Sequence, residues 1–246
     1  MSKETENKPL SPAKQLWNKI FFVAYVIAFI AAVCFSSFVW YQKTYFTSYW
    51  INGQSMWPTL NAETRTAYGT LFNENVLSMN GATGVDFVIG DEHEYVINNV
   101  KRFDIVICKY SKSDTYDKIK RIIALPGETF YIDSKEVNNP GNGVVHILNK
   151  ETNQYEVLEQ PLATKYIAVG TYPEKYTNPT TLGEDEYFVM GDNRAHSSDS
   201  RENGPVKKSD INAKAIALVA RCRTVIVPGS NDLEAVDVQY MWPRFF

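Results

Sequence analysis

Apolar and charged positions divide this chain into two unequal parts. Residues 20–41 (IFFVAYVIAFIAAVCFSSFVWY) form a run of 22 positions without a charge. At a rise of about 1.5 Å per residue, a helix over this run reaches about 33 Å, enough to cross the hydrocarbon core of a bilayer. The pattern therefore predicts a transmembrane anchor over residues 20–41.

Lysines flank this run unequally. Lys14 and Lys19 lie just before it, with Lys3 and Lys8 further back, whereas Lys43 alone follows closely. Positive charge favours the cytoplasmic side, so we expect residues 1–19 to be a cytoplasmic tail and residues 42–246 to lie outside. A cleavable signal peptide is the alternative, but its apolar region is normally shorter and ends in small residues rather than bulky aromatic ones.

The remaining chain carries short apolar runs typical of strands. Gly, Pro, Asn and Asp bound these runs, and no stretch sustains a helical period comparable to the anchor. The clearest runs are residues 104–108, 119–124, 187–190 and 215–219. Two long polar stretches interrupt them. We expect the second, about 131–183, to be a smaller β lobe inserted into a core lobe, whereas the first, 61–101, has no predicted structure.

Composition excludes several classes of function. The net charge of −3 over 246 residues gives no basic surface for nucleic acid. The three cysteines show no metal-like spacing, and the three histidines are scattered, so we expect neither a metal nor a cofactor. A disulfide between Cys108 and Cys222 remains open.

Candidate chemistry begins with a serine shortly after the anchor, in residues 53–60 (GQSMWPTL). Ser55 lies between Gly53, which allows close backbone approach, and Pro58, which fixes the following turn. Met56 and Trp57 place apolar side chains beside this polar centre. A serine hydroxyl needs a base to become nucleophilic at neutral pH.

A lysine supplies a candidate base in residues 120–128 (KRIIALPGE). On a strand, Lys120 and Arg121 point to opposite faces, and Lys120 shares its face with Ile122 and Ala124. Burial on such a face disfavours the ammonium form and lowers the lysine pKa. A neutral amine can accept a proton from a serine without help from histidine. A snorkelling surface lysine is the alternative.

A third motif, residues 191–201 (GDNRAHSSDSR), concentrates charges and hydroxyls. Such a loop can brace itself through carboxylate–guanidinium pairs and still offer a hydroxyl, although a solvated turn has the same composition.

Together the three motifs resemble those of the type I signal peptidase family. Its nucleophile motif is similar to GxSMxPT, its lysine motif to KRxxxxPGD with Glu128 here for the final Asp, and its third motif to GDNRxxSxDSR. A weaker motif, RGDIVV, is matched at residues 102–107 with Phe103 in place of Gly. The resemblance implies a mainly β fold: an N-terminal transmembrane helix, then an extracytoplasmic region of two antiparallel β-sheet lobes.

The resemblance also implies roles for single residues. Ser55 is the expected nucleophile, Lys120 the general base, and Ser197 the residue that orients the lysine. Gly53 and Ser55 would supply backbone donors to the oxyanion, because Gly53 occupies a position where some members carry a serine. The residues expected to support the site are Arg121, Asp192, Arg194, Asp199 and Arg201, and those expected to line the substrate groove are Met56, Trp57 and Pro58.

The expected partners follow from the same resemblance: signal-peptide-bearing preproteins cut after A-x-A-like sites, and the lipid bilayer of the plasma membrane. Three alternatives remain. Self-cleaving repressors also use Ser and Lys, but they need a DNA-binding module and no anchor. A Ser–His–Asp hydrolase would need His196 as its base. An anchored protein without activity would not need both Ser55 and Lys120.

Overall fold

The computed structural model describes residues 11–51, 53, 55–61, 82–111, 113–133, 144–159, 176–194, 197–226 and 233–246, apart from the side chains of 82–85, 222–226 and 233–237. Two units are distinguished, residues 1–45 and 46–246.

The first unit is one long helix, α1 (Pro12–Tyr45). Ser11 precedes it, and its carbonyl accepts the N–H of Gln15. Proline is well suited to the first helical position because its missing N–H would have no partner there. None of the helix residues, all of which are described, is buried, and the helix is long and apolar enough to cross a membrane. It extends beyond the 20–41 run at both ends, so the flanking lysines Lys14, Lys19 and Lys43 are helical too.

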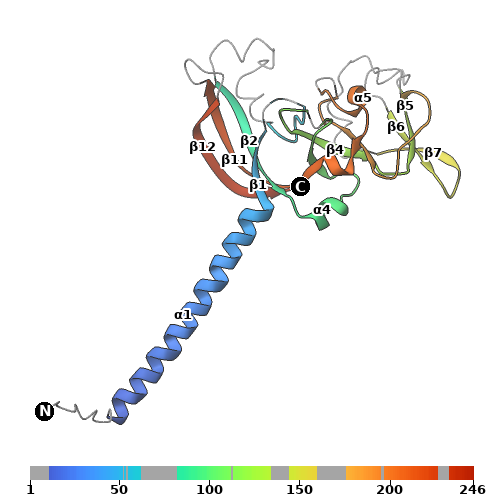
Figure 1. Cartoon of the computed structure of the whole chain (residues 1–246). Coiled ribbons are helices and arrows are strands. Elements are labelled where there is room, and N and C mark those ends of the chain that lie inside the picture. The colour runs from blue at the N-terminus through green and yellow to red at the C-terminus, as the bar shows by residue number, and fades with distance from the viewer. Residues whose placement is uncertain are drawn as a thin grey trace. The chain divides into compact units, whose positions relative to one another are not determined.

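The second unit is built on antiparallel sheets, which confirms the mainly β prediction. The larger sheet has eight strands in the order β1-β2-β11-β3-β4-β9-β10, with β12 also paired to β11. Figure 1 shows β2, β11 and β12 as long neighbouring strands. The strands of the larger sheet are β1 (Phe46–Ile51), β2 (Ala82–Asp91), β3 (Ile105–Cys108), β4 (Lys118–Ala124), β9 (Glu186–Met190), β10 (Val206–Lys207), β11 (Ile211–Ile226) and β12 (Leu233–Phe245).

A second sheet of four strands has the order β7-β6-β5-β8. Its strands are β5 (Thr129–Asp133), β6 (Val144–Asn149), β7 (Gln154–Val157) and β8 (Thr180–Thr181). The predicted inserted lobe, 131–183, overlaps these strands, but residues 134–143 and 160–175 lie outside the described part. In the described part of the chain, two short helices complete the unit, α4 (Glu94–Asn98) and α5 (Ser200–Asn203), with a 3-10 turn η3 (Lys208–Asp210).

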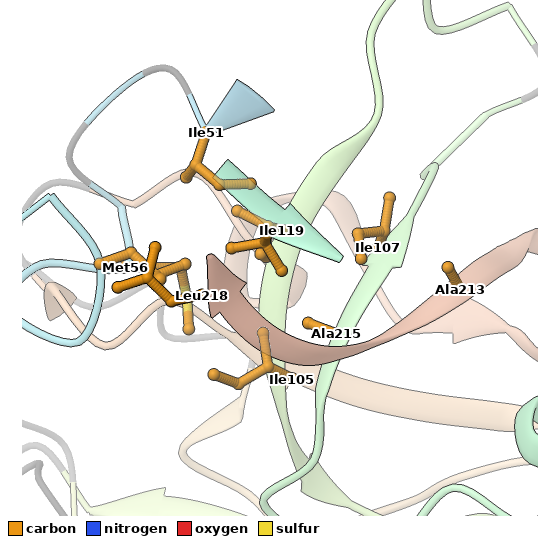
Figure 2. Close-up of a cluster of buried hydrophobic side chains, with 10 residues drawn as sticks. Ile51, Met56, Ile105, Ile107, Ile119, Ala213, Ala215 and Leu218 are labelled. Atoms are coloured by element: carbon orange, nitrogen blue, oxygen red, sulfur yellow. The ribbon is translucent and has the colours of Figure 1, made fainter. Parts of the chain in front are cut away.

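Three clusters of buried apolar side chains stabilise the second unit. One joins the end of β1 and the loop after it to strands β3, β4 and β11, and Figure 2 shows Met56 of that loop beside Leu218 of β11. The second lies between the two sheets around Phe130 and Phe188. The third packs Val106, Ile122 and Val189 together. The loop after β1 is therefore held in place by the core of the larger sheet.

Strand β4 has a central place in this sheet. It pairs with β3 on one side, where Val106 lies opposite Lys120, and with β9 on the other, where Met190 lies opposite Arg121. Because β9 ends at Met190, the loop that follows begins next to Arg121. The sheet thus brings together motifs that are far apart in sequence.

Candidate active site

Ser55 and Lys120 meet in the structure. Lys120 Nζ lies 3.0 Å from Ser55 Oγ, although the two residues are 65 positions apart in sequence. The Lys120 amine also donates to the carbonyl oxygen of Ile119 at 2.8 Å. In the neutral form, an amine that donates one N–H to Ile119 can direct its lone pair at the Ser55 hydroxyl. This arrangement suits proton transfer from the serine.

The surroundings of Lys120 favour that neutral form. Only 3% of the residue is exposed. Desolvation by burial is the main cause that lowers the pKa of the Lys120 amine from its ordinary 10.5, and the charges of Lys118 and Arg201 lower it further. Asp199 and Cys108 act in the opposite direction, but burial outweighs them. Burial on this face of β4 thus lowers the pKa of Lys120, as expected for a lysine that shares its face with apolar residues.

Arg121 and Asp192 form a two-pronged ion pair. Arg121 Nε donates to Asp192 Oδ1 at 2.8 Å, and Arg121 Nη2 donates to Asp192 Oδ2 at 2.6 Å. The Thr59 hydroxyl donates to the same carboxylate at 2.5 Å, and Arg121 Nη1 donates to the carbonyl of Phe103 at 2.8 Å. The pair therefore links β4, the loop after β9 and the Ser55 loop.

Asp199 and Arg201 form a second buried pair. Arg201 Nε and Nη2 each donate to the Asp199 carboxylate at 2.8 Å, and Asp199 has no exposed surface. Desolvation raises the pKa of the Asp199 carboxyl, but the hydrogen bonds and charge of Arg201 and the N–H of Gly191 outweigh it, so that pKa is lowered. The pair sits in the third motif and stays ionised.

Gly191 allows these loops to approach closely. A Cβ at residue 191 would collide with the Ser197 side chain and lie 2.5 Å from the carbonyl oxygen of Ser55. The neighbouring Arg194 is buried and donates through Nε to the Gly191 carbonyl at 3.0 Å. A side chain at residue 191 would push the third motif away from Ser55.

The Ser197 side chain is buried beside Gly191, and its hydroxyl contributes to the low pKa of Asp199. In the described part of the chain, the hydrogen bonds of Lys120 Nζ run to Ser55 and Ile119. The lysine-orienting role of Ser197 therefore stays a prediction.

The three residues expected to line the substrate groove differ in exposure. Met56 is 1% exposed and packs in the apolar cluster with Ile51 and Leu60, because its side chain points into the sheet core. The groove role of Met56 stays a prediction. Trp57 and Pro58 are partly exposed, so they remain candidates.

Gly53 adopts a φ of +102°, the region that favours glycine. Phe103 also has a positive φ, +70°, at the position where the resemblance expects glycine. The sequence did not indicate whether Phe103 would keep the positive φ that a glycine adopts easily. It is held in place in part by the Arg121 bond to the Phe103 carbonyl.

Sequence reasoning missed a set of residues that hold the Ser55 loop. Asn61 bonds to the carbonyls of Ile51 and Gly53, and Arg244 of β12 donates to the carbonyl of Thr59 at 2.5 Å. Nothing in the one-dimensional pattern marks these residues, because polar residues at strand ends are common. The spacing of six between Ser55 and Asn61 alone carries no chemical signal.

Two histidines in the described part of the chain contact side chains other than Ser55 and Lys120. His93 pairs with Asp91 at 2.6 Å, His146 stacks on Tyr131, and His196 lies outside the described residues. Cys108 is a free buried thiol whose pKa is raised to about 12 by desolvation. Among the described residues, no cluster of three or more His, Cys, Asp and Glu side chains suits a metal ion.

The chain is similar to known peptidases in sequence. The family model described as "Signal peptidase, peptidase S26" matches residues 18–220. The chain is 32% identical to Signal peptidase I P of Bacillus subtilis subsp. natto over 212 residues, which is 86% of this chain and 90% of that protein. It is 29% identical to Signal peptidase I of Bacillus caldolyticus over 176 residues, 69% and 76% of the two chains. A solved signal peptidase I from Enterococcus faecalis is 27% identical, over 47% of this chain and 96% of that one, with a TM-score of 0.34.

The family model covers most of α1, the Ser55 loop, strand β4 and the third motif. A family model that spans most of the chain and a relative above 30% identity along most of its length identify the class as a serine-type peptidase. The chain belongs to the signal peptidase family, peptidase S26.

Proposed function

We propose that this protein is a membrane-anchored signal peptidase that cuts preproteins after A-x-A-like sites, with Ser55 as nucleophile and Lys120 as general base. The observation that carries the proposal is the 3.0 Å contact between Lys120 Nζ and Ser55 Oγ, made by an amine whose pKa is lowered by burial. No metal or cofactor is needed for this chemistry.

The first step is attack of Ser55 Oγ on the carbonyl carbon of the scissile bond. Lys120 Nζ accepts the hydroxyl proton as the Oγ–C bond forms, and the resulting ammonium then returns a proton to the departing amine as the C–N bond breaks. Water then attacks the acyl carbon: Lys120 Nζ accepts a proton from the water as the new O–C bond forms, and returns it to Ser55 Oγ as the ester bond breaks. The amine must begin each half-reaction uncharged.

The carbonyl oxygen develops negative charge during both attacks, and main-chain N–H groups at Ser55 and around Gly53 are the proposed donors to it. Gly53 has no side-chain hydroxyl to donate, so backbone N–H groups stabilise the oxyanion. Arg121, Asp192, Arg194, Asp199 and Arg201 support the site, because their ion pairs and hydrogen bonds fix the loop that contacts Ser55. Ser197 is proposed to orient Lys120 during turnover.

The proposed location is the plasma membrane, with a single pass and the N-terminus in the cytoplasm. The lysine excess before the apolar run supports this orientation. The catalytic region would then face preproteins as they leave the membrane. A partly exposed Trp57 and Pro58 next to Ser55 suit an extended substrate strand that adds to a sheet edge.

The test uses the full-length enzyme in detergent micelles and a preprotein with alanine one and three residues before the cut. Ser55→Ala and Lys120→Met should each reduce cleavage at least a thousandfold while the protein stays folded. Matched controls are Ser48→Ala and Lys207→Met, both at exposed strand positions, and these should keep most of the activity. Mass spectrometry of the product should place the cut after the alanine pair.

Two results would contradict the proposal. Normal turnover by Lys120→Met would remove the amine mechanism. A thousandfold loss in His196→Ala, with the lysine variant active, would instead establish a histidine-dependent hydrolase. A preprotein with leucine or lysine immediately before the cut should not be processed.

A further inference from the structure

The Ser55 loop is closed at its base by one amide side chain, that of Asn61. Asn61 Nδ2 donates to the carbonyl of Ile51 at 2.8 Å and to the carbonyl of Gly53 at 2.7 Å. Its Oδ1 accepts the main-chain N–H of Asp86 at 2.8 Å. Both amide protons and the oxygen of Asn61 are therefore used, and only 1% of the residue is exposed.

Asp86 anchors this amide to the sheet. The main-chain N–H of Asn61 donates to Asp86 Oδ2 at 2.7 Å, and Arg221 Nε donates to Asp86 Oδ1 at 2.9 Å. Asp86 lies opposite Ile51 on β1 and opposite Arg221 on β11. A buried carboxylate in the middle of three strands thus fixes the residue that holds the loop.

One of these bonds ends two residues from the nucleophile. A Cβ built on Gly53 would meet no described atom within 4 Å, so no contact in that direction holds this part of the loop. The hydrogen bond from Asn61 to the Gly53 carbonyl fixes it instead. On the other side of Ser55, Met56 and Leu60 are held by the apolar core.

We propose that Asn61 is a positioning residue for the reaction: its side-chain amide sets the place of Ser55 Oγ relative to Lys120 Nζ. It touches neither substrate nor the reacting atoms. Misplacement of a nucleophile by about 1 Å costs on the order of a hundredfold in rate. This inference rests on the proposed function, since it concerns the same serine.

Glycine at position 61 is the sharpest variant. Asn61 has a φ of +56°, which glycine adopts readily, and Asn61→Gly keeps the main-chain N–H that bonds to Asp86. It removes only the three side-chain bonds. Asn153→Gly is the matched control, because Asn153 is exposed in the turn between β6 and β7 and has a φ of +53°.

The experiment measures kcat and KM for preprotein cleavage by both variants and the wild type, well below the lowest Tm, with the folded fraction followed by circular dichroism. We expect Asn61→Gly to lower kcat at least tenfold with KM within twofold, and Asn153→Gly to match the wild type. A merely structural role would reduce activity only in proportion to the folded fraction. Equal kcat for the two variants, or a kcat loss that disappears on cooling together with the unfolded fraction, would overturn the proposal.

Arg221→Lys covers the case in which Asn61→Gly does not fold, because it loosens Asp86 from outside the loop. We expect a two- to fivefold fall in kcat at constant KM, and an unchanged kcat would overturn the proposal. Failure of the proposed function is recognised separately, since the wild type would then not cut the preprotein at all or Ser55→Ala would still cut it.

Discussion

The main-chain N–H of Asn193 donates to the carbonyl oxygen of Ser55 at 2.9 Å. This bond joins the third motif directly to the residue proposed as nucleophile, across 138 positions of sequence. Together with the ion pair from Asp192 to Arg121, it ties the Ser55 loop, strand β4 and the loop after β9 into one rigid site. Rigidity of this kind keeps the reacting groups aligned between substrate binding and bond cleavage.

The pH dependence of cleavage should report the state of Lys120. Because burial lowers the pKa of this amine below 10.5, the reactive neutral form should already be present at a pH where an exposed lysine is charged. We expect kcat/KM to fall as pH drops through that pKa, with a one-proton slope, because the ammonium cannot accept a proton. Rates measured from pH 5 to 10.5 check this.

A charge-removing variant sharpens that measurement. The positive charge of Lys118 lowers the pKa of Lys120, so Lys118→Met should move the midpoint of the profile to higher pH. Lys207→Met should leave it in place. A midpoint at or above 10.5 in the wild type would contradict the buried-amine mechanism.

Removal of the buried amine should stabilise the fold. Between the lowered native pKa and the unfolded value near 10.5, the unfolded chain binds a proton at Lys120 that the native protein does not. The free energy of unfolding therefore rises with pH across that window. We expect Lys120→Met to be more stable than the wild type at pH 7 and the difference to shrink toward pH 10.5, as measured by urea unfolding. Ser55→Ala, which leaves the amine buried, should show the wild-type pH dependence. A Lys120→Met protein with unchanged or lower stability at pH 7 would contradict this reasoning.

The buried Arg121–Asp192 pair should contribute more to the free energy of unfolding than a more exposed ion pair does. Its side chains are 11% and 4% exposed, against 23% and 22% for Arg102 and Glu128. Asp192→Asn leaves the Arg121 guanidinium without its charge partner and should cost about 3 kcal/mol. Glu128→Gln should cost about 1 kcal/mol or less. Chemical denaturation of both variants decides the comparison, and equal losses would contradict it.

Arg244 should act on the Ser55 loop from the C-terminal strand. Its Nη2 donates to the Thr59 carbonyl at 2.5 Å from an exposed position, so the bond should contribute about 1 kcal/mol. We expect Arg244→Gln to lower kcat/KM two- to tenfold in micelles with little change in Tm. Tyr240→Ser, at a position 86% exposed on the same strand, is the control and should remain fully active. Identical kcat/KM in the two variants would show that the bond has no part in activity.

Much of the site could be predicted from local sequence. The apolar run identified the helix because hydrophobic length is a one-dimensional property, although the helix extends to Pro12 and Tyr45. Strand geometry placed Lys120 on a face with Ile122 and Ala124, but a buried amine and a surface lysine both remained open until the three motifs were taken together. Arg121 and Asp192, both expected to support the site, are paired in the structure.

Other features depended on contacts between distant strands. Met56 was expected to line the substrate groove, and its packing with Ile51 and Leu60 in the core could not be read from its place beside Ser55. Asn61, Asp86 and Arg221 had no sequence signal, since their meaning arises only where β1, β2 and β11 lie side by side.

The sequence by itself determined an apolar helix, a β-rich region and the residues able to perform serine chemistry with an amine. The tertiary structure alone decided that Ser55 meets Lys120 and that Asn61 and Arg244 hold the loop between them. The physical reason is that hydrophobic period and side-chain chemistry are local properties, whereas hydrogen-bond partners and desolvation depend on which strands the folded chain places together.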